Sequence, residues 1–360
     1  MGYQILALGG DGIGPKVLAS GIRVAESAAS EFGVKLNIKH GLLGGSSWDQ
    51  LGTFCSNKLL EEAKQATALL VGAVGGPKWD NIEIEGPPEI QDGLMRLRKE
   101  LKTFFGIRPA YFYENMNSLV PFKRKIVTGT DILVLREMCG GVMFGKPRGS
   151  KNENGNRFAF DTAIYNEFEI KRFVEASFEM ALLRKRNIVS ADKANVMESY
   201  KLWRQIVDEV SKNYPSVKVT HMYADNCLFQ MCMRPSQFDV VIGCNFIGDL
   251  ISDLAGAVTG SLGMLPSACL SGPPGKNVHG IYEPVHGSAP DLEDTTKANP
   301  IGMILSVAMM FDYSFGRIDI RNKIEKAVSN AIKAGLRTPD IGGSDSTDMI
   351  TKGVINEIEK

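Results

Sequence analysis

Short apolar runs alternate with amphipathic segments along the whole chain. The runs QILALGG (4–10) and ATALLVGAVGG (66–76) both end in glycines and predict buried strands. Further strand candidates are DILVLRE (131–137), NIVSADK (187–193), KVTHMYADN (218–226) and FDVVIGCN (238–245). The helical period of about 3.6 residues recurs in the segments 15–33, 169–186 and 199–214. This alternation predicts an α/β chain with much parallel sheet.

The composition is that of a globular protein and argues against two kinds of partner. The 360 residues are long enough for two or three domains. Lys+Arg and Asp+Glu both total 41, so the chain lacks the basic excess that a nucleic-acid or anionic membrane surface requires. The cysteines show no CxxC spacing, which argues against a zinc site or a disulfide framework. We expect a cytoplasmic protein, although a removed targeting peptide would leave no trace.

A glycine-rich stretch, GGDGIGP (9–15), links the first predicted strand to the first predicted helix. Such a turn can cradle a phosphate. Its glycines, however, are spaced GxGxG rather than GxGxxG, and no ribose-binding acid stands at the usual distance. Two interpretations stay open at this point, a phosphate-binding loop and a tight strand-to-helix turn.

Two carboxylates four residues apart indicate a metal site. Asp249 and Asp253 in GDLISD fall on one face of a predicted helix, where like charges repel each other. A divalent cation would reverse that repulsion, and hard carboxylate oxygens suit Mg²⁺ or Mn²⁺. The neighbouring residues are largely apolar, so the acids should be half-buried and in need of a partner. We therefore favour a metal site over a solvated acidic face, with Asp225 as a candidate third ligand.

Several cations stand where an acidic ligand would bind. Lys193 ends a predicted strand, and ligands of α/β proteins bind at the carboxyl ends of strands. An exposed lysine with a covered stem is the alternative. Arg136 closes another strand, just before the glycine-rich GGVMFGKPRG (140–149). Arginine grips carboxylates through paired hydrogen bonds, which makes Arg98 and Arg108 further candidates, although each is also compatible with a surface position.

The segment IYEPVHGSAPDLEDTTKANP (281–300) has the composition of an exposed loop with free backbone N–H groups. His286 is followed by Gly, Ser, Ala and Pro, and Asp291 carries a carboxylate able to hydrogen-bond a ribose diol. Spacing alone leaves the function of this loop open.

Taken together, these motifs resemble the β-decarboxylating dehydrogenases, the family of isocitrate, 3-isopropylmalate, homoisocitrate and tartrate dehydrogenases. The resemblance covers essentially the whole chain and is carried, in order, by GDGIGP, GGPKWD, GLMRLRKE, IRPA, LREMCGG, DKANVME, MYADN, GDLISD, TGSLGMLPSA, EPVHGSAPD and ANP. GGPKWD, TGSLGMLPSA and the chain length look most like the 3-isopropylmalate branch.

The resemblance implies a two-domain α/β fold of the isopropylmalate/isocitrate dehydrogenase type, rather than the classical Rossmann fold. Residues 1–103 and 258–360 would form the cofactor-binding domain, and residues 104–257 the substrate and dimerisation domain. The active site of a homodimer would be shared between subunits. The implied reaction is the NAD- and Mg²⁺- or Mn²⁺-dependent oxidative decarboxylation of a 3-substituted malate, nominally 3-isopropylmalate to 2-oxoisocaproate in leucine biosynthesis. K⁺ is a further candidate cofactor.

The resemblance also implies roles for individual residues. The substrate would be bound by Arg98, Arg108, Arg136 and Leu94. The metal ligands would be Asp249 and Asp253 of one subunit and Asp225 of the other. Lys193, also from the partner subunit, would help to take the proton from the substrate hydroxyl. The adenosine end of NAD would be held by His286, Gly287, Ser288, Ala289, Pro290 and Asn299. Asp291 would accept hydrogen bonds from the ribose and repel a 2′-phosphate, which favours NAD over NADP.

Met143 departs from the family pattern at a position that matters for chemistry. The family reads GG-I-Y-F-G where this chain reads GGVMFG, and the tyrosine is taken to supply the final proton of the reaction. Methionine has no acidic proton. General acid–base help is typically worth about 10²–10⁴-fold, so turnover should be slow unless water or another residue substitutes.

A second departure precedes Arg98. The family reads P-E-x-G-L-L-x-L-R, and this chain reads PPEIQDGLMRLR. Two questions stay open: whether Glu89 or Gln91 faces the nicotinamide, and whether Arg96 enters the substrate pocket and favours a polar side group.

Three interpretations follow. The favoured one is a dehydrogenase of a 3-substituted malate. The second is a relative with a different substrate or impaired decarboxylation, and the third is a non-catalytic regulatory or structural paralogue. The metal, lysine and arginine positions are all intact, which favours an enzyme.

Overall fold

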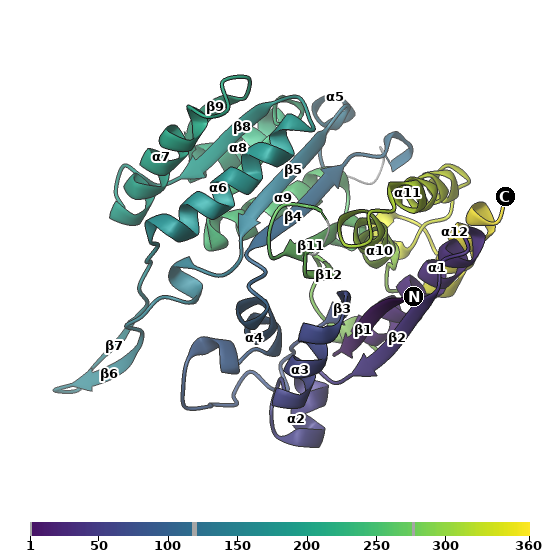
Figure 1. Ribbon diagram of the computed structural model, residues 1–360, viewed down its shortest axis with the longest axis horizontal. Coiled ribbons are helices and arrows are strands. Elements are labelled where there is room, and N and C mark those ends of the chain that lie inside the picture. The colour runs from purple at the N-terminus through teal and green to yellow at the C-terminus, as the bar shows by residue number, and fades with distance from the viewer. Residues whose placement is uncertain (1, 117–120, 276–277) are drawn as a thin grey trace.

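The computed structural model describes residues 2–116, 121–275 and 278–360 (Figure 1). Its strands form one ten-stranded sheet and a separate two-stranded hairpin. In chain order the strands are β1 (Tyr3–Gly10), β2 (Leu36–Gly41), β3 (Ala68–Ala73), β4 (Phe105–Tyr111), β5 (Asp131–Glu137), β6 (Gly149–Glu153), β7 (Asn156–Phe160), β8 (Asn187–Asp192), β9 (Lys218–Tyr223), β10 (Val240–Gly243), β11 (Pro266–Leu270) and β12 (Gly280–Pro284).

The large sheet has the order β2-β1-β3-β12-β11-β4-β5-β10-β8-β9. Its two outer groups, β2-β1-β3-β12 and β5-β10-β8-β9, are parallel, as the sequence predicts. The centre is not: β12 with β11, β11 with β4, and β4 with β5 are all antiparallel pairs. Three successive reversals make the two parallel groups run in opposite directions. This antiparallel centre separates the fold from an all-parallel Rossmann sheet.

The helices cover this sheet in two groups at its two ends (Figure 1). Helices α1, α10, α11 and α12 pack against one another near the two termini, while α6 packs on α7 and α8 on α9 at the other end. In chain order the helices are α1 (Gly14–Glu31), α2 (Gly45–Leu51), α3 (Asn57–Gln65), α4 (Gly93–Glu100), α5 (Arg124–Val127), α6 (Glu167–Leu182), α7 (Glu198–Ser211), α8 (Ala224–Met233), α9 (Asn245–Thr259), α10 (Ile301–Tyr313), α11 (Ile318–Lys333) and α12 (Thr347–Ile358).

The predicted elements are confirmed, but two predicted strands extend past their observed ends into the helix that follows. The strand predicted over 238–245 is β10, which ends at Gly243, and α9 begins at Asn245. The three helical segments become α1, α6 and α7. The strand predicted over 218–226 ends at Tyr223, because α8 begins at Ala224. The segments at both chain ends pack together through α1 and α12, and strands from both ends and from the middle share one sheet. The division into domains 1–103 plus 258–360 and 104–257 stays a prediction.

The GGDGIGP stretch forms a packed turn between β1 and α1. Asp11 is buried there, and its carboxylate accepts three backbone hydrogen bonds of 2.7–2.8 Å, from Gly45, Ser46 and Gly75. Gly12 has φ +55°, and a Cβ at this position would lie 2.1 Å from the carbonyl oxygen of Ser288. The loop therefore ties β1 to α2 and to the 286–291 loop. A carboxylate at the centre of the turn favours the tight-turn interpretation over a phosphate-binding one.

The hairpin β6–β7 projects away from the rest of the molecule (Figure 1). Apart from the half-buried Phe160, its strand residues are exposed. Among the described helices, none is both long and apolar enough to cross a membrane.

Candidate active site

Two buried arginines lie side by side where β4 meets β5. Arg108 pairs with Val134 in the antiparallel register, so Arg136 is its diagonal neighbour two residues further along β5. Both arginines are only 5% exposed. The Nη1 atom of Arg108 lies 3.0 Å from Oδ1 of Asp249 on α9, and Nη1 of Arg136 contacts the same oxygen. The structure thus brings together three of the residues that the sequence singles out.

The close approach of α9 to β5 depends on Gly248. A Cβ at this position would lie 3.0 Å from Cβ and Cγ of Arg136. Burial and the neighbouring charge of Arg108 lower the pKa of Arg136 to about 9, although Asp249 opposes them. The guanidinium still carries its charge at neutral pH. Two buried guanidinium groups share one carboxylate oxygen, and guanidinium N–H groups suit an acidic ligand.

The acidic pair on α9 has the character of a cation site. Burial and the charge of Asp249 raise the pKa of Asp253, so the neighbouring carboxylate destabilises the charged form of Asp253. A hard divalent cation would relieve that repulsion. Within a single chain, the described residues contain no group of three His, Cys, Asp or Glu side chains placed to hold a metal. The donor set therefore fits a cation provided that a further ligand is supplied from outside the chain.

Lys193 and Asp225 form a second group, at the adjacent ends of β8 and β9. Lys193 Nζ donates to Oδ1 of Asp225 at 2.6 Å. This hydrogen bond is the main reason that the pKa of Asp225 is lowered. Both side chains are well exposed. The described residues show no hydrogen bond or ion pair between this pair and Asp249.

Arg98 on α4 has a different partner from the other two arginines. Its Nη2 lies 2.5 Å from Oε1 of Glu283 on β12, and both side chains are largely buried. Burial alone would lower the pKa of Arg98, but the charge and hydrogen bond of Glu283, with Cys269 and Asp92, together outweigh it and raise that pKa. Arg98 is also close enough for its charge to lower the pKa of Arg136. Glu283 was not predicted, because its position in EPVHG gives no sign of a partner 185 residues away.

The structure shows the orientation of the Arg96 side chain. Its guanidinium donates to the carbonyl oxygen of Cys55 and, at 2.6 Å, to Oδ1 of Asn57, at the start of α3. Leu94, one turn of α4 away from Arg98, is buried in a small apolar cluster with Leu43 and Leu97. The role of Leu94 in a substrate pocket stays a prediction.

The structure also shows the positions of Glu89 and Gln91, the two residues considered as neighbours of the nicotinamide. Glu89, in a short 3₁₀ turn before α4, forms an ion pair with Lys99. Burial would raise the pKa of Glu89, but the hydrogen bond and charge of Lys99, a backbone hydrogen bond and the charge of Lys146 together outweigh it and lower that pKa. The side chain of Gln91 instead donates to the carbonyl oxygen of Ile84 at 3.0 Å. Of the two side chains, only that of Glu89 is charged, and it faces Lys99 in the last turn of α4.

The 286–291 loop has features that suit a bound cofactor. His286 Nδ1 lies 2.8 Å from the carbonyl oxygen of Gly287, and burial lowers the pKa of His286, so its ring is neutral. The other ring nitrogen, Nε2, is buried and has no hydrogen-bond partner among the described residues. Gly287 and Asp291 are exposed, and a Cβ on Gly287 would meet no atom within 4 Å. An orphaned ring nitrogen beside open backbone fits a nucleotide ligand.

Asn299 lies near this loop but has two structural partners. Its Oδ1 accepts a hydrogen bond from the backbone of Ile301 at 3.0 Å, which fixes the start of α10. Its Nδ2 donates to Asp340 at 2.9 Å. Contact between Asn299 and a cofactor stays a prediction, as does that of Ser288, Ala289 and Pro290.

Met143 lies in a short 3₁₀ turn (Gly141–Met143) directly after the glycines that follow β5. Its Sδ accepts a long hydrogen bond of 3.5 Å from Nη2 of Arg136. The position at which the resemblance expects a proton donor is thus occupied by a weak acceptor in contact with Arg136.

A buried network of hydrogen bonds holds the backbone that leads into this turn. Glu137 is fully buried and accepts hydrogen bonds from the backbone of Cys139 (3.0 Å) and Gly140 (2.8 Å) and from the hydroxyl of Tyr165 (3.1 Å). Burial, more than any of these bonds, sets the pKa of Glu137, which rises to about 7. The Tyr165 hydroxyl also accepts the backbone N–H of Asn245 at 3.0 Å.

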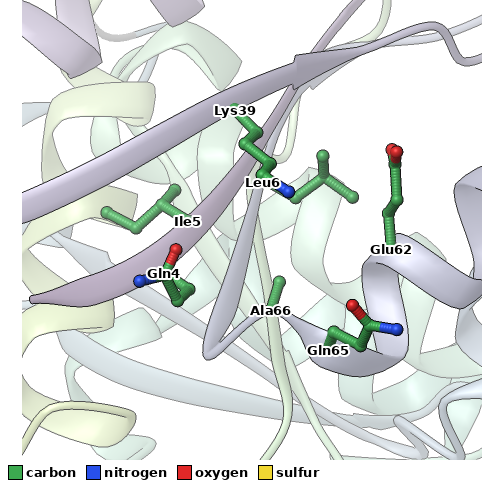
Figure 2. A pocket seen from close by; sticks show the side chains of 7 residues that line it. All are labelled: Gln4, Ile5, Leu6, Lys39, Glu62, Gln65 and Ala66. Carbon is green, nitrogen blue, oxygen red and sulfur yellow. The ribbon is translucent and has the colours of Figure 1, made fainter.

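A pocket elsewhere on the molecule contains none of the predicted site residues. It lies between β1, β2 and α3, where Lys39, Glu62 and Gln65 line its rim (Figure 2). Its volume of about 220 Å³ is below the roughly 300–1,000 Å³ of small-molecule sites. We therefore place the active site at the arginines and acids of β4, β5 and α9.

Comparison with known proteins identifies the family. Residues 4–358 match a family model described as isocitrate/isopropylmalate dehydrogenase. The 3-isopropylmalate dehydrogenase of Aquifex aeolicus is 44% identical over 99% of this chain and 96% of its own length. That of Xanthomonas euvesicatoria is 45% identical over 98% and 97% of the two chains. The crystal structure of isocitrate dehydrogenase from Methylococcus capsulatus superposes with a TM-score of 0.88 at 26% identity, covering 99% of this chain and 100% of the other.

These findings confirm both the resemblance stated from the motifs and the fold class that it implies. The family match runs through every motif that carried the resemblance, from GDGIGP to ANP.

Stability should depend on pH through Glu137. Its folded pKa of about 7 lies above the ordinary 4.5, so its contribution is complete below pH 4.5 and is lost as the pH rises through 7. The variant Glu137→Gln cannot titrate at this position. Between pH 4 and pH 8 we expect the wild-type free energy of unfolding to fall relative to the variant by on the order of 3 kcal/mol. Urea titrations at a series of pH values measure this; a difference that is constant with pH would contradict it.

Proposed function

The chain belongs to the isocitrate/isopropylmalate dehydrogenase family, and within it we propose that this enzyme oxidises and decarboxylates a 3-substituted malate, nominally 3-isopropylmalate. The observation that carries the proposal is the convergence of Arg108 and Arg136, both buried, on one carboxylate of an acidic pair. A malate-type acid has two carboxylates for the arginines and a hydroxyl beside one of them. Guanidinium groups bind carboxylates through paired hydrogen bonds, which suits such a dianion.

The proposed cofactors are NAD and Mg²⁺ or Mn²⁺, with K⁺ as a further candidate. When bound, the divalent cation would polarise the substrate hydroxyl as a Lewis acid, and NAD⁺ would accept the hydride. Asp249 and Asp253 would hold the cation together with Asp225 of the partner subunit. The 286–291 loop would hold the nucleotide, and the carboxylate of Asp291 would bind the ribose and exclude a 2′-phosphate.

The proton of the substrate hydroxyl has a proposed acceptor in Lys193 of the partner subunit. A base must lie within hydrogen-bond reach of the proton that it takes. In each subunit Lys193 already donates to Asp225 at 2.6 Å, so the lysine and the proposed metal ligand would enter the partner's site together. Arg98, Arg108 and Arg136 would hold the substrate while the proton and hydride leave.

A homodimer is proposed through α8 and α9, which pack on each other. Phe229 and Met233 on α8 are 58% and 51% exposed, and Phe246 and Leu250 on α9 are both 47% exposed. Each pair is spaced four residues apart, so each forms an apolar stripe. Large exposed side chains gathered in this way mark an interface. A second copy would cover both stripes, and Asp225 and Asp249 lie at the start and in the middle of the same two helices.

A second candidate function is favoured by Met143. Its contact with Arg136 places a thioether where the resemblance expects a tyrosine hydroxyl. An enzyme that oxidises its substrate but protonates the product slowly, or that takes another 3-substituted malate, fits this observation. A non-catalytic paralogue fits less well, because the arginines still converge on Asp249 and Lys193 still pairs with Asp225.

A substrate panel tests the proposal. The enzyme is supplied with NAD⁺, Mg²⁺ and 2-hydroxy diacids that differ in their 3-substituent, and NADH and carbon dioxide are recorded separately. We expect equal amounts of both from 3-isopropylmalate, at a higher kcat/KM than from the other acids. Asp249→Asn protein gives the background rate. NADH without carbon dioxide would indicate impaired decarboxylation, and no NADH from any acid would indicate the non-catalytic paralogue.

Replacing Met143 with tyrosine tests the missing proton donor. With 3-isopropylmalate we expect Met143→Tyr to raise kcat by up to about 10²-fold, the lower end of what general acid catalysis supplies. Met143→Phe is the matched control, because it adds the ring without the hydroxyl and should give no gain. An equal gain from phenylalanine would attribute the effect to size. No gain from either would mean that the pocket is built around methionine.

A further inference from the structure

Arg136 can present either of two edges to a carboxylate, and one of them is already occupied. A guanidinium offers paired N–H groups along its Nε–Nη2 edge and along its Nη1–Nη2 edge. Oδ1 of Asn245 accepts both bonds of the first edge, from Nε at 3.1 Å and from Nη2 at 2.8 Å. Along the second edge Nη1 contacts Asp249 and Nη2 contacts only the weakly accepting sulfur of Met143, which a ligand carboxylate would displace.

Asn245 is itself held in one orientation. Its Nδ2 donates to the carbonyl oxygen of Gly140 at 3.2 Å. Reversing the amide would put an NH₂ group against the guanidinium and an oxygen against a carbonyl, so two unfavourable contacts enforce the observed orientation. The backbone N–H of Asn245 is bound by the hydroxyl of Tyr165, which in turn donates to Glu137. Asn245 is 1% exposed and so offers no surface to a ligand.

We propose that Asn245 is a positioning residue for substrate binding: it occupies one edge of Arg136 and thereby presents the other edge to a substrate carboxylate. Tyr165 and Glu137 hold Asn245 in place. The proposal rests on the proposed function to the extent that the ligand is a diacid. It assigns a role to three buried residues that would otherwise only fill the space beneath the glycine turn.

The geometry shows what Asn245 prevents. Without its oxygen, the Nε–Nη2 edge of a buried charge has no acceptor as strong as the carboxylate of Asp249. The guanidinium would then turn to bind Asp249 through two N–H groups. That rotation would remove the Nη1–Nη2 edge from the substrate.

Asn245→Ala tests the proposal by the affinity for a diacid. Calorimetry with Mg²⁺ and 3-isopropylmalate, without NAD⁺, gives Kd independently of turnover, and steady-state assays give KM for substrate and for NAD⁺. We expect Kd and substrate KM to rise roughly 10- to 100-fold, the equivalent of one hydrogen bond to a charged group. KM for NAD⁺ should not change, because the variant does not touch the nucleotide loop.

The matched control is Asn330→Ala. Asn330 on α11 also makes one side-chain hydrogen bond, to Glu357 at 3.0 Å, and lies outside the site. It should lower the thermal midpoint without changing Kd. If Asn245→Ala does not fold, Tyr165→Phe is the alternative test. It removes the hydroxyl that accepts the backbone N–H of Asn245, and it should also raise Kd.

The outcomes separate the two proposals. If the wild-type protein binds 3-isopropylmalate and Asn245→Ala binds it equally well, the positioning role is overturned and the proposed function stands. An equal rise in KM for NAD⁺ would also overturn it, since that points to a general loss of structure. If the wild-type protein binds no diacid, the proposed function fails and the positioning role fails with it.

Discussion

Arg136 carries a full charge with only 5% of its surface exposed, so its neighbours must supply the stabilisation that water would otherwise give. They do so on three sides. Asn245 accepts two of its N–H groups, Asp249 provides an opposing charge, and the sulfur of Met143 provides a weak acceptor. None of these neighbours alone neutralises both Arg136 and the adjacent Arg108. An acidic substrate would add a further carboxylate beside the two guanidinium groups.

The antiparallel centre of the sheet is what brings this charge together. Because β4 and β5 run in opposite directions, Arg108 and Arg136 become diagonal neighbours on one face. Gly248 then allows α9 to approach that face closely enough for Asp249 to reach both arginines. The position of Met143 has the same origin, because the turn after β5 places this residue against Arg136. One strand pairing thus fixes the two arginines proposed to bind substrate, a proposed metal ligand and the unusual methionine.

Much of this could be predicted from the sequence. Apolar runs ending in glycine located β1 and β3, and helical periodicity located α1, α6 and α7. Motif order identified the family and so the arginines and acids. The antiparallel centre could not be predicted, because apolar runs carry no sign of strand direction.

Asn245 and Tyr165 were missed for a related reason. Their partners lie 109 and 28 residues away in the chain, and only folding brings a buried amide or hydroxyl to its acceptor. Their sequence surroundings look like core. Glu137, which follows Arg136 in LREMCGG, was not predicted as part of the site. Residues that orient a site residue through hydrogen bonds can therefore be identified only in a structure, whereas candidate ligand-binding residues can be predicted from a motif.

A double-mutant cycle between Arg136 and Asn245 tests the central claim most directly. Lysine at 136 has no Nε–Nη2 edge, so Asn245 has nothing to occupy once Arg136→Lys is made. The account predicts that Asn245→Ala raises the Kd for 3-isopropylmalate in the wild-type background and leaves it unchanged in the Arg136→Lys background. If Asn245→Ala raises Kd by the same factor in both backgrounds, the two residues act independently and the account is contradicted.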